Sequence, residues 1–513
     1  MKKNTKYLIA SLACVAVLGA AALALVLTGG SEGEDTASSA SDETITLLEK
    51  TQQDLESVTV TNETGTITVL AHEETVESSS DTASSDAEDA SGTESESEPE
   101  TEIVYEVEEL EGLPFNTSDV DAIARAGYLV SANRSIGTVD NPEKFGLTDP
   151  TLTVEATFRD GSTFSYIVGV ENNGAYYIQP EGSEEVYMGA VSSALFKSAY
   201  DLADTSLYQL ETETDDSAAG STAQATGTAT DSAIFNTIHL SGTAFDQEVD
   251  IEYDSEIGYL MHEPRETEAD TTRMGTITSA LTSLSADALI LPHPEEDELA
   301  QYGLDNPAVV CDFTSGGQEY TLTLSDTDAD GNRYLIYSGI DAVFQIANSK
   351  VTAWADADPF LLQSTLTLLP NIVDVHTMEL TMNGETYSFT IDRTVNEEDS
   401  TEDDTVYDYT VTSGDGTALD YEENFKHFYL ALISITVSED TQDMPEGEPT
   451  LTCTYTYQDK PGSDTIEYYR VSDRRYAIVE NGQLMGLALS DDVDLAMQDL
   501  ELLYSGQDVP DVY

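Results

Sequence analysis

The segment whose residue spacing is most suggestive of chemistry is "DTDADGNRY", which begins at Asp326. Asp326, Asp328 and Asp330, followed by Gly331, match the start of a calcium loop, in which oxygens at alternate positions coordinate the cation. Tyr337 stands at the twelfth position, where such a loop needs a bidentate Glu. The corresponding segment of an earlier repeat, "ENNGAYY", is a plain turn. A hairpin turn is therefore the preferred interpretation, with calcium as the weaker alternative and no other cofactor predicted.

Other residues capable of catalysis do not form a motif. The six histidines are scattered, and the sequence contains no HExxH, GxSxG or phosphate-binding loop. His239 and His376 lie near corresponding strands, but aligning the repeats offsets them by three positions, which argues against a metal pair. Carboxylates are too abundant for a catalytic pair to be selected. The sequence therefore predicts a protein that is not an enzyme, and it assigns no catalytic residue.

The charge balance excludes one large class of function. The chain has 513 residues, with 99 Asp and Glu against 19 Lys and Arg. Such a surface repels phosphate backbones, so no nucleic-acid partner is expected. Cations and basic partners are favoured, although acidity is also a general means of keeping a surface protein soluble.

The elements that would carry any site come from an internal repeat. "FGLTDP" ends at Pro150 and "YGLDNP" ends at Pro307, and alternating apolar residues follow both prolines, as in a strand with one buried face. A proline can begin a strand, and the residue before it is restricted to extended geometry. A third, degraded copy, "MPEGEP", ends at Pro449. The shared markers, with a tyrosine 27 residues after each proline, are Gly146, Pro150 and Tyr177, then Gly303, Pro307 and Tyr334, and finally Pro449 and Tyr476.

Cys311 and Cys453 each lie four residues after the proline of their repeat, where the first copy has Val154. Cysteine behaves there as a small apolar residue on a core face. A disulfide between them would require two units to abut at equivalent points, so buried free thiols are the preferred interpretation.

Each unit also contains segments with helical periodicity. "TSDVDAIARAGYLV" has Thr117 as a candidate N-cap, and "AVSSALFKSAYDLAD" at residues 190–204 is interpreted as a second helix of the first unit. These segments predict an α+β fold class: three repeated units of antiparallel strands with packed helices. One N-terminal transmembrane helix is expected before them.

The expected organisation follows from shifts in composition. Segment 74–102 is rich in Ser, Glu and Asp without apolar periodicity, and segment 211–231 is rich in Thr, Ala and Gly, so both are predicted to be disordered. The predicted divisions are a membrane anchor at 1–30, repeat unit 1 at 31–210 with the acidic insert 74–102, a flexible linker at 211–231, repeat unit 2 at 232–369 and the degenerate repeat unit 3 at 370–513.

Residues 7–28 are apolar and uncharged, and three lysines precede them. As a helix rising about 1.5 Å per residue, this segment would cross a hydrocarbon layer of ~30 Å. Because positive charge favours the cytoplasmic side, we expect a single-pass protein of the cell membrane with the bulk of its chain extracytoplasmic. A cleaved signal peptide is the rival interpretation.

Two longer segments resemble a known family. "FGLTDPTLTVEATFRDGSTFSYIVGVENNGAYYIQPEGSEEVYM" and "YGLDNPAVVCDFTSGGQEYTLTL" resemble the bacterial domain of unknown function 4340, with its Y/F-G-L-x-x-P turn, D-G, YY and VY features. The second copy lacks the Gly that ends the aliphatic strand, where Ser325 stands, and it lacks the YY pair; the third copy keeps only the spacing. The resemblance implies a membrane-anchored bacterial protein often associated with transporter components, and it carries over no catalytic residue.

The combined expectation is a membrane-anchored extracytoplasmic protein that acts as a non-enzymatic accessory or interaction subunit beside an ABC-type transport system. Its expected partners are the membrane, through the N-terminal helix, and transporter or other envelope proteins. Two alternatives stay open: a surface module that binds a ligand or cation, and a cell-envelope hydrolase whose site lies between units.

The topology can be tested on cells from which the wall has been removed. We expect external protease to remove the acidic bulk of the chain and to leave an epitope at the lysine-rich N-terminus protected. Protection of the whole chain would reverse the predicted orientation.

Overall fold

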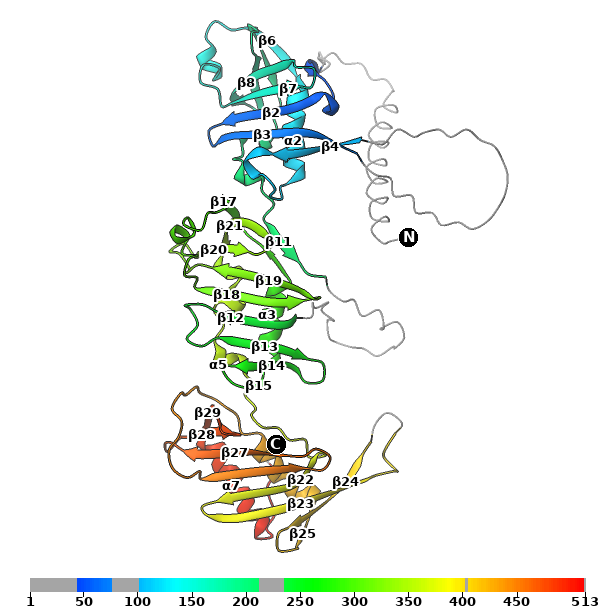
Figure 1. The fold of residues 1–513 in the computed structure, drawn as a ribbon, viewed down its shortest axis with the longest axis vertical. Coiled ribbons are helices and arrows are strands. Elements are labelled where there is room, and N and C mark those ends of the chain that lie inside the picture. The colour runs from blue at the N-terminus through cyan, green and yellow to red at the C-terminus, as the bar shows by residue number, and fades with distance from the viewer. Residues whose placement is uncertain (1–43, 76–100, 212–234, 402–404, 512–513) are drawn as a thin grey trace, which may run out of the picture.

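The computed structural model describes residues 44–75, 101–211, 235–401 and 405–511. These residues form three large antiparallel sheets, arranged one after another along the long axis of the molecule (Figure 1). We refer to them in chain order as the first, second and third sheets. The predicted membrane anchor at 1–30, most of the insert 74–102 and nearly all of the linker 211–231 lie outside the described residues.

Each sheet joins two meanders through their first strands. The first sheet has the order β4 (Thr101–Val107), β3 (Gly65–Thr75), β2 (Leu55–Asn62), β7 (Leu152–Phe158), β8 (Thr163–Asn172), β9 (Ala175–Pro180), β10 (Glu185–Gly189) and β6 (Arg134–Thr138). The second has the order β15 (Thr267–Glu268), β14 (Gly258–Glu263), β13 (Val249–Asp254), β12 (Phe235–Ser241), β18 (Val309–Ser315), β19 (Gln318–Leu324), β20 (Asn332–Tyr337), β21 (Ile340–Ala347) and β17 (Ala288–Pro292). The third has the order β25 (Ala418–Leu419), β24 (Tyr407–Ser413), β23 (Glu385–Val395), β22 (Val375–Met382), β26 (Leu451–Tyr457), β27 (Ser463–Arg470), β28 (Arg475–Glu480) and β29 (Gln483–Leu489).

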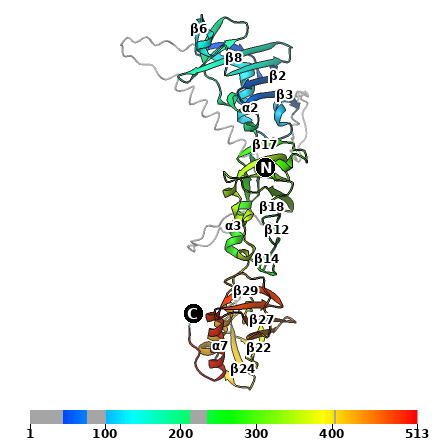
Figure 2. The same ribbon diagram turned by 90° about the vertical axis from the view of Figure 1, so that its left-hand side faces the viewer.

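Smaller elements complete the described chain. Two short antiparallel pairs are β1 (Ile45–Glu49) with β5 (Leu129–Ala132), and β11 (Ser206–Gln209) with β16 (Ser283–Ser285). The α-helices are α2 (Thr117–Tyr128), α3 (Thr271–Leu281), α4 (Thr352–Ala355), α5 (Pro359–Leu362), α6 (Lys426–Ile433) and α7 (Ser490–Tyr504). Seen edge-on, α3 and α7 lie on the same side of their sheets (Figure 2).

The predicted α+β class with packed helices is wrong. Strand makes up 46% and helix 20% of the structure, so the fold consists mainly of large antiparallel sheets. The expected transmembrane helix falls outside the described residues, and within them no helix is long and apolar enough to cross a membrane. The helix expected from Thr117 is present as α2, whereas the helix expected at residues 190–204 is not.

The second helix expected in the first unit, at residues 190–204, does not form. The chain there makes two short 3-10 turns, η4 (Ser193–Phe196) and η5 (Tyr200–Leu202). The side-chain amide of Asn62 donates to the carbonyls of Leu195 and Lys197 at 2.9 and 2.8 Å. These carbonyls are then engaged by a side chain instead of by the next helical turn. The start of α2 also differs by one residue, because Asn116, not Thr117, is the N-cap and accepts from the Asp119 amide.

The two central strands of each sheet share one register. In every sheet the pairing shifts after its first residue pair and then runs without interruption through the buried face. A one-residue slip would turn every side chain to the other face, so an identical register places equivalent residues in each core. The equivalent core pairs are Val60 with Val154, Leu240 with Cys311, and Leu380 with Cys453.

The proline turn precedes the strand in a repeated way. Short 3-10 turns end at Gly146 and Gly303, which both have φ of 69°, a left-handed conformation that glycine adopts without strain. The aromatic residue before each glycine then lies edge-on against the tyrosine 27 residues after the proline. These two ring pairs are Phe145 with Tyr177, at a centroid distance of 4.8 Å, and Tyr302 with Tyr334, at 4.9 Å.

The third copy replaces this ring pair with a polar contact. Met444 occupies the aromatic position and is exposed, whereas Tyr476 is fully buried. The Tyr476 hydroxyl donates to Asp494 at 2.7 Å and accepts from Arg470 at 2.9 Å. Gly486 stands where the other copies have Tyr187 and Phe344, because a Cβ there would lie 2.5 Å from Val437 Cγ1. The degraded sequence of the third copy therefore has a structural explanation.

The first and second sheets share one buried apolar cluster, whereas the third has its own. Tyr208 on β11, the strand that follows the first sheet in the chain, packs against the second sheet, where its ring centroid lies 5.3 Å from that of Tyr337 and 5.5 Å from that of Tyr320. Cys311 and Cys453 are free and fully buried in separate sheets. Burial raises the pKa of the Cys453 thiol to about 12, so it is held as an uncharged core side chain.

The segments expected to be disordered keep ordered ends. Glu74 and Thr75 pair with Glu102 and Thr101 at the tips of β3 and β4, so the outermost residues of the predicted insert belong to the first sheet. The rest of segment 74–102 lies outside the described residues, and its disorder stays a prediction.

The shared register predicts which face a substitution affects. Cys453→Asn would bury an amide without partners and should reduce the free energy of unfolding of the third sheet by about 2–4 kcal/mol. Thr452→Asn, one residue earlier on the opposite face, should cost under about 1 kcal/mol. Hydrogen exchange measured by mass spectrometry would assign the loss to residues 375–504. Equal losses for the two variants would contradict the register.

Candidate functional site at the joint between the second and third sheets

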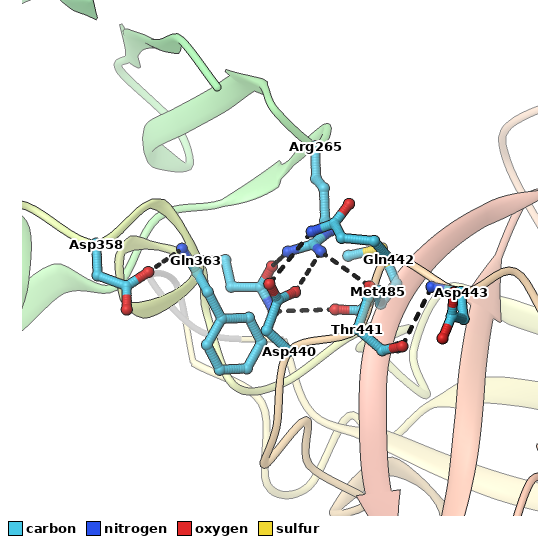
Figure 3. A network of polar contacts seen from close by, with 9 residues as sticks. Arg265, Asp358, Gln363, Asp440, Thr441, Gln442, Asp443 and Met485 are labelled. Atoms are coloured by element: carbon cyan, nitrogen blue, oxygen red, sulfur yellow. Dashed lines mark hydrogen bonds and ion pairs between the residues drawn. The ribbon is translucent and has the colours of Figure 1, made fainter. Parts of the chain in front are cut away.

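Polar side chains from separate sheets meet where the second sheet adjoins the third. Arg265 follows β14 directly and is only 7% exposed. Its guanidinium donates to Gln363 Oε1 at 3.1 Å and to Asp440 Oδ1 at 2.5 Å, and the carbonyl of Thr441 lies 3.4 Å away (Figure 3). Gln363 in turn donates to the carbonyl of Met485 on β29 at 3.2 Å. One buried cation thus connects both sheets and the segment between them.

The Arg265 contacts fix the relative position of the second and third sheets more than they stabilise the fold. Desolvating a charged pair offsets much of its Coulomb attraction, but removing one partner leaves a buried, unpaired charge. The Arg265 guanidinium makes the three polar contacts above, and the ring centroid of Phe360 lies 6.0 Å from its Cζ. We therefore interpret the Arg265 network as the contact that sets how the third sheet meets the second.

A cleft of 610 Å³ opens beside this network. Its volume is in the range of small-molecule sites. Phe245, Pro264 and Phe360 form apolar walls, while Asp246, Asp358 and Asp440 add carboxylates. Asp356 also lines the cleft. Burial opposes its ionisation, but hydrogen bonds from Thr352 and Asn348 and the charge of Arg333 lower its pKa.

A second cavity, of 470 Å³, lies at the same joint, and we call it the joint groove. The second sheet and its loops contribute Ile257 and Glu268, and the connecting segment contributes Leu369. Ile257 and Leu369 are 55% and 44% exposed, so both present apolar surface at the groove. The third sheet contributes Tyr457, Lys460, Asp464 and Glu480.

The carboxylates of the joint groove differ in their surroundings. Burial, and then the neighbouring charge of Asp464, raises the pKa of Glu480 to about 7, although the Leu368 amide donates to it. Asp464 accepts from the hydroxyl of Tyr457 and from the side-chain amide of Asn481, the latter at 3.2 Å. The groove can therefore bind a cation through one carboxylate while the other holds a proton near neutral pH.

The calcium candidates lie elsewhere, in the turn between β19 and β20. Asp328 Oδ1 accepts from the backbone amides of Asp330 and Asn332 at 2.9 and 2.8 Å, so its carboxylate organises the turn. Asp326 precedes this turn, and Gly331 within it has φ of 86°. Within residues 44–75, 101–211, 235–401 and 405–511, no three His, Cys, Asp or Glu side chains are arranged to hold a metal ion. Calcium binding by Asp326, Asp328 and Asp330 receives no geometric support.

Sequence reasoning missed Arg265, Gln363, Asp440 and Glu480. The partners Arg265 and Asp440 are 175 residues apart, and no local motif relates them. One available signal was the scarcity of cations: an arginine retained among so many carboxylates is a candidate for a structural or binding role.

Comparison with known families gives one match. Residues 106–228 and 260–445 match the family described as a domain of unknown function, DUF4340. The two matched ranges cover more than half of the chain, and the protein belongs to this family. No curated protein and no solved structure matches the chain. The biochemical role thus rests on the site itself.

The raised pKa of Glu480 predicts a pH-dependent stability. Because its folded pKa of about 7 exceeds the ordinary 4.5, the folded state binds an extra proton, and ionisation becomes costly as pH rises between these values. Glu480→Gln, which still accepts from Leu368, should raise the free energy of unfolding by roughly 1–2 kcal/mol at about pH 8, after allowance for solvent screening, and by little at about pH 4.5.

The matched control is Glu379→Gln, an exposed carboxylate on β22 of the same sheet. Thermal unfolding of both variants across this pH range would check the prediction. An equal gain for both variants would show that general charge reduction, and not burial of Glu480, is responsible.

Proposed function

We propose that this protein is a non-enzymatic interaction subunit of the cell envelope and that it binds a basic partner segment in the joint groove. The observation that carries the proposal is the combination of exposed apolar side chains and partly desolvated carboxylates at the junction of two separately cored sheets. Apolar contacts supply affinity, and the carboxylates select a cationic side chain. A net charge of −80 would speed the encounter with a basic partner.

The wider setting is part of the same proposal. The apolar segment 7–28 would anchor the chain in the membrane, and the three sheets would extend on the extracytoplasmic side. The family resemblance adds an ABC-type transport system as the assembly that the protein would accompany. In this setting the successive sheets act as a spacer that holds the joint groove away from the anchor.

One observation favours a second candidate, a cell-envelope hydrolase. Glu480 and Asp464 are neighbouring carboxylates whose environments differ, which is the usual requirement for an acid and a base at one site. The third candidate, a surface module that binds a ligand or cation, draws support from the overall acidity and from the carboxylates of the joint groove.

Site-specific photo-crosslinking in intact membranes tests the interaction proposal. A crosslinker at Leu369 should capture a basic partner, and capture should fall as salt is raised, because the attraction is partly electrostatic. A crosslinker at Val170 in the first sheet is the control, since both side chains are 44% exposed. Equal capture from both positions, or none from Leu369, would refute a binding role for the groove.

The same variants separate the interaction subunit from the hydrolase. Turnover of envelope glycan that is abolished by Glu480→Gln and retained in Glu379→Gln would favour the hydrolase and overturn the non-enzymatic proposal. Partner capture at Leu369 without such turnover would support the interaction subunit.

A further inference from the structure

A histidine forms a separate contact between the first and second sheets. His293 follows β17 and lies with its Nδ1 2.9 Å from Asp341 Oδ2, at the start of β21. Its Nε2 lies 2.7 Å from the backbone carbonyl of Glu111, in the loop before α2 of the first sheet. The ring therefore bridges two parts of the chain that are 182 residues apart.

The two partners determine the protonation state of the ring. A carboxylate and a carbonyl are both acceptors, whereas a neutral imidazole has one donor and one acceptor nitrogen. Only the imidazolium can donate to Asp341 and Glu111 at the same time. The contact as observed thus requires a proton that a histidine in water loses near neutral pH.

The backbone holds the ring in this position. His293 has φ of 47°, in the left-handed region, which is uncommon for a residue other than glycine. Its amide also donates to the Asp341 carbonyl at 3.0 Å, so main chain and side chain fix the residue to β21. The imidazole consequently moves with the second sheet, and its contact with Glu111 is the one that can open.

We propose that His293 is a proton-operated clasp between the first and second sheets, closed when the imidazole is charged and open at the Glu111 carbonyl when it is neutral. On deprotonation the remaining proton stays on Nδ1, because the Asp341 carboxylate is the stronger acceptor. Nε2 then presents a lone pair to the Glu111 carbonyl, and the two repel each other. The pairing of β11 with β16 and the burial of Tyr208 keep the sheets joined, so opening is a local loosening of one side of the joint.

The groups around the His293 ring favour its charged form, which is the closed state of the clasp. The carboxylates of Asp341 and Glu111 face it, and the hydrogen bond to Asp341, followed by that to the Glu111 carbonyl, raises the pKa of His293 above its usual 6.5. Because the pKa of His293 is raised in the closed state, the stabilisation from the closed contact is fully present below about pH 6.5. It is lost as the pH rises through the pKa of His293 in the folded protein.

Hydrogen exchange of the amides at residues 110–113, corrected for the intrinsic effect of pH, tests the clasp on the full chain. Between about pH 5.5 and 8.5 these amides should exchange about tenfold faster as the ring loses its proton, since a charged hydrogen bond contributes about that factor. Asp341→Asn should shift the transition to lower pH by removing the stabilising carboxylate, with the second sheet still protected.

Two histidine variants make the test specific. His293→Gln should abolish the transition, whereas His72→Gln, which removes an exposed histidine of the first sheet beside Glu106, should leave it unchanged. A pH-independent wild type, or a transition that survives in His293→Gln, would overturn the proposal. Protection elsewhere in the second sheet distinguishes loss of the clasp from loss of folding.

Discussion

Each sheet depends on the pairing of its two central strands, which come from opposite halves of the repeat. β2 with β7, β12 with β18, and β22 with β26 are antiparallel neighbours separated by a long stretch of chain that includes a helix or turn. A shift after the first residue pair occurs at the same place in all three. Because the side-chain period of a strand is two, this register decides which residues enter the core, and the other strands extend the sheet outward from these two as successive antiparallel neighbours.

The proline turn protects that register in two different ways. In the first two copies, the turn has a left-handed glycine, and a pair of aromatic rings holds it against β9 or β20. In the third, the rings are replaced by Tyr476, Asp494 and Arg470, which meet through hydrogen bonds. The sequence motif fades while the strand persists, because the core alternation and not the motif carries most of the apolar burial.

The sequence was informative where the physics is local and periodic. Strand alternation after each proline predicted β7, β18 and β26, which begin two residues after Pro150, Pro307 and Pro449. The prediction of a helix failed at residues 190–204. There the side-chain amide of Asn62, more than 130 residues away, donates to the carbonyls that a helix would use. The contacts between neighbouring sheets could not be predicted from the sequence. Arg265, Glu480 and His293 obtain their surroundings from distant segments, and no spacing in the sequence encodes such contacts.

The chain has few cationic side chains, and two buried arginines among them connect separate parts of the structure. Arg333 is buried and links Asn348, Asp356 and the Ser325 carbonyl within the second sheet. Arg265 does the same between sheets. Because such cations are engaged internally, they neutralise little of the outer surface, which stays strongly acidic. Salt screens exposed charges much more than buried pairs. The attraction of the proposed basic partner should therefore weaken as salt is raised, whereas the geometry of the joint between the second and third sheets should change little.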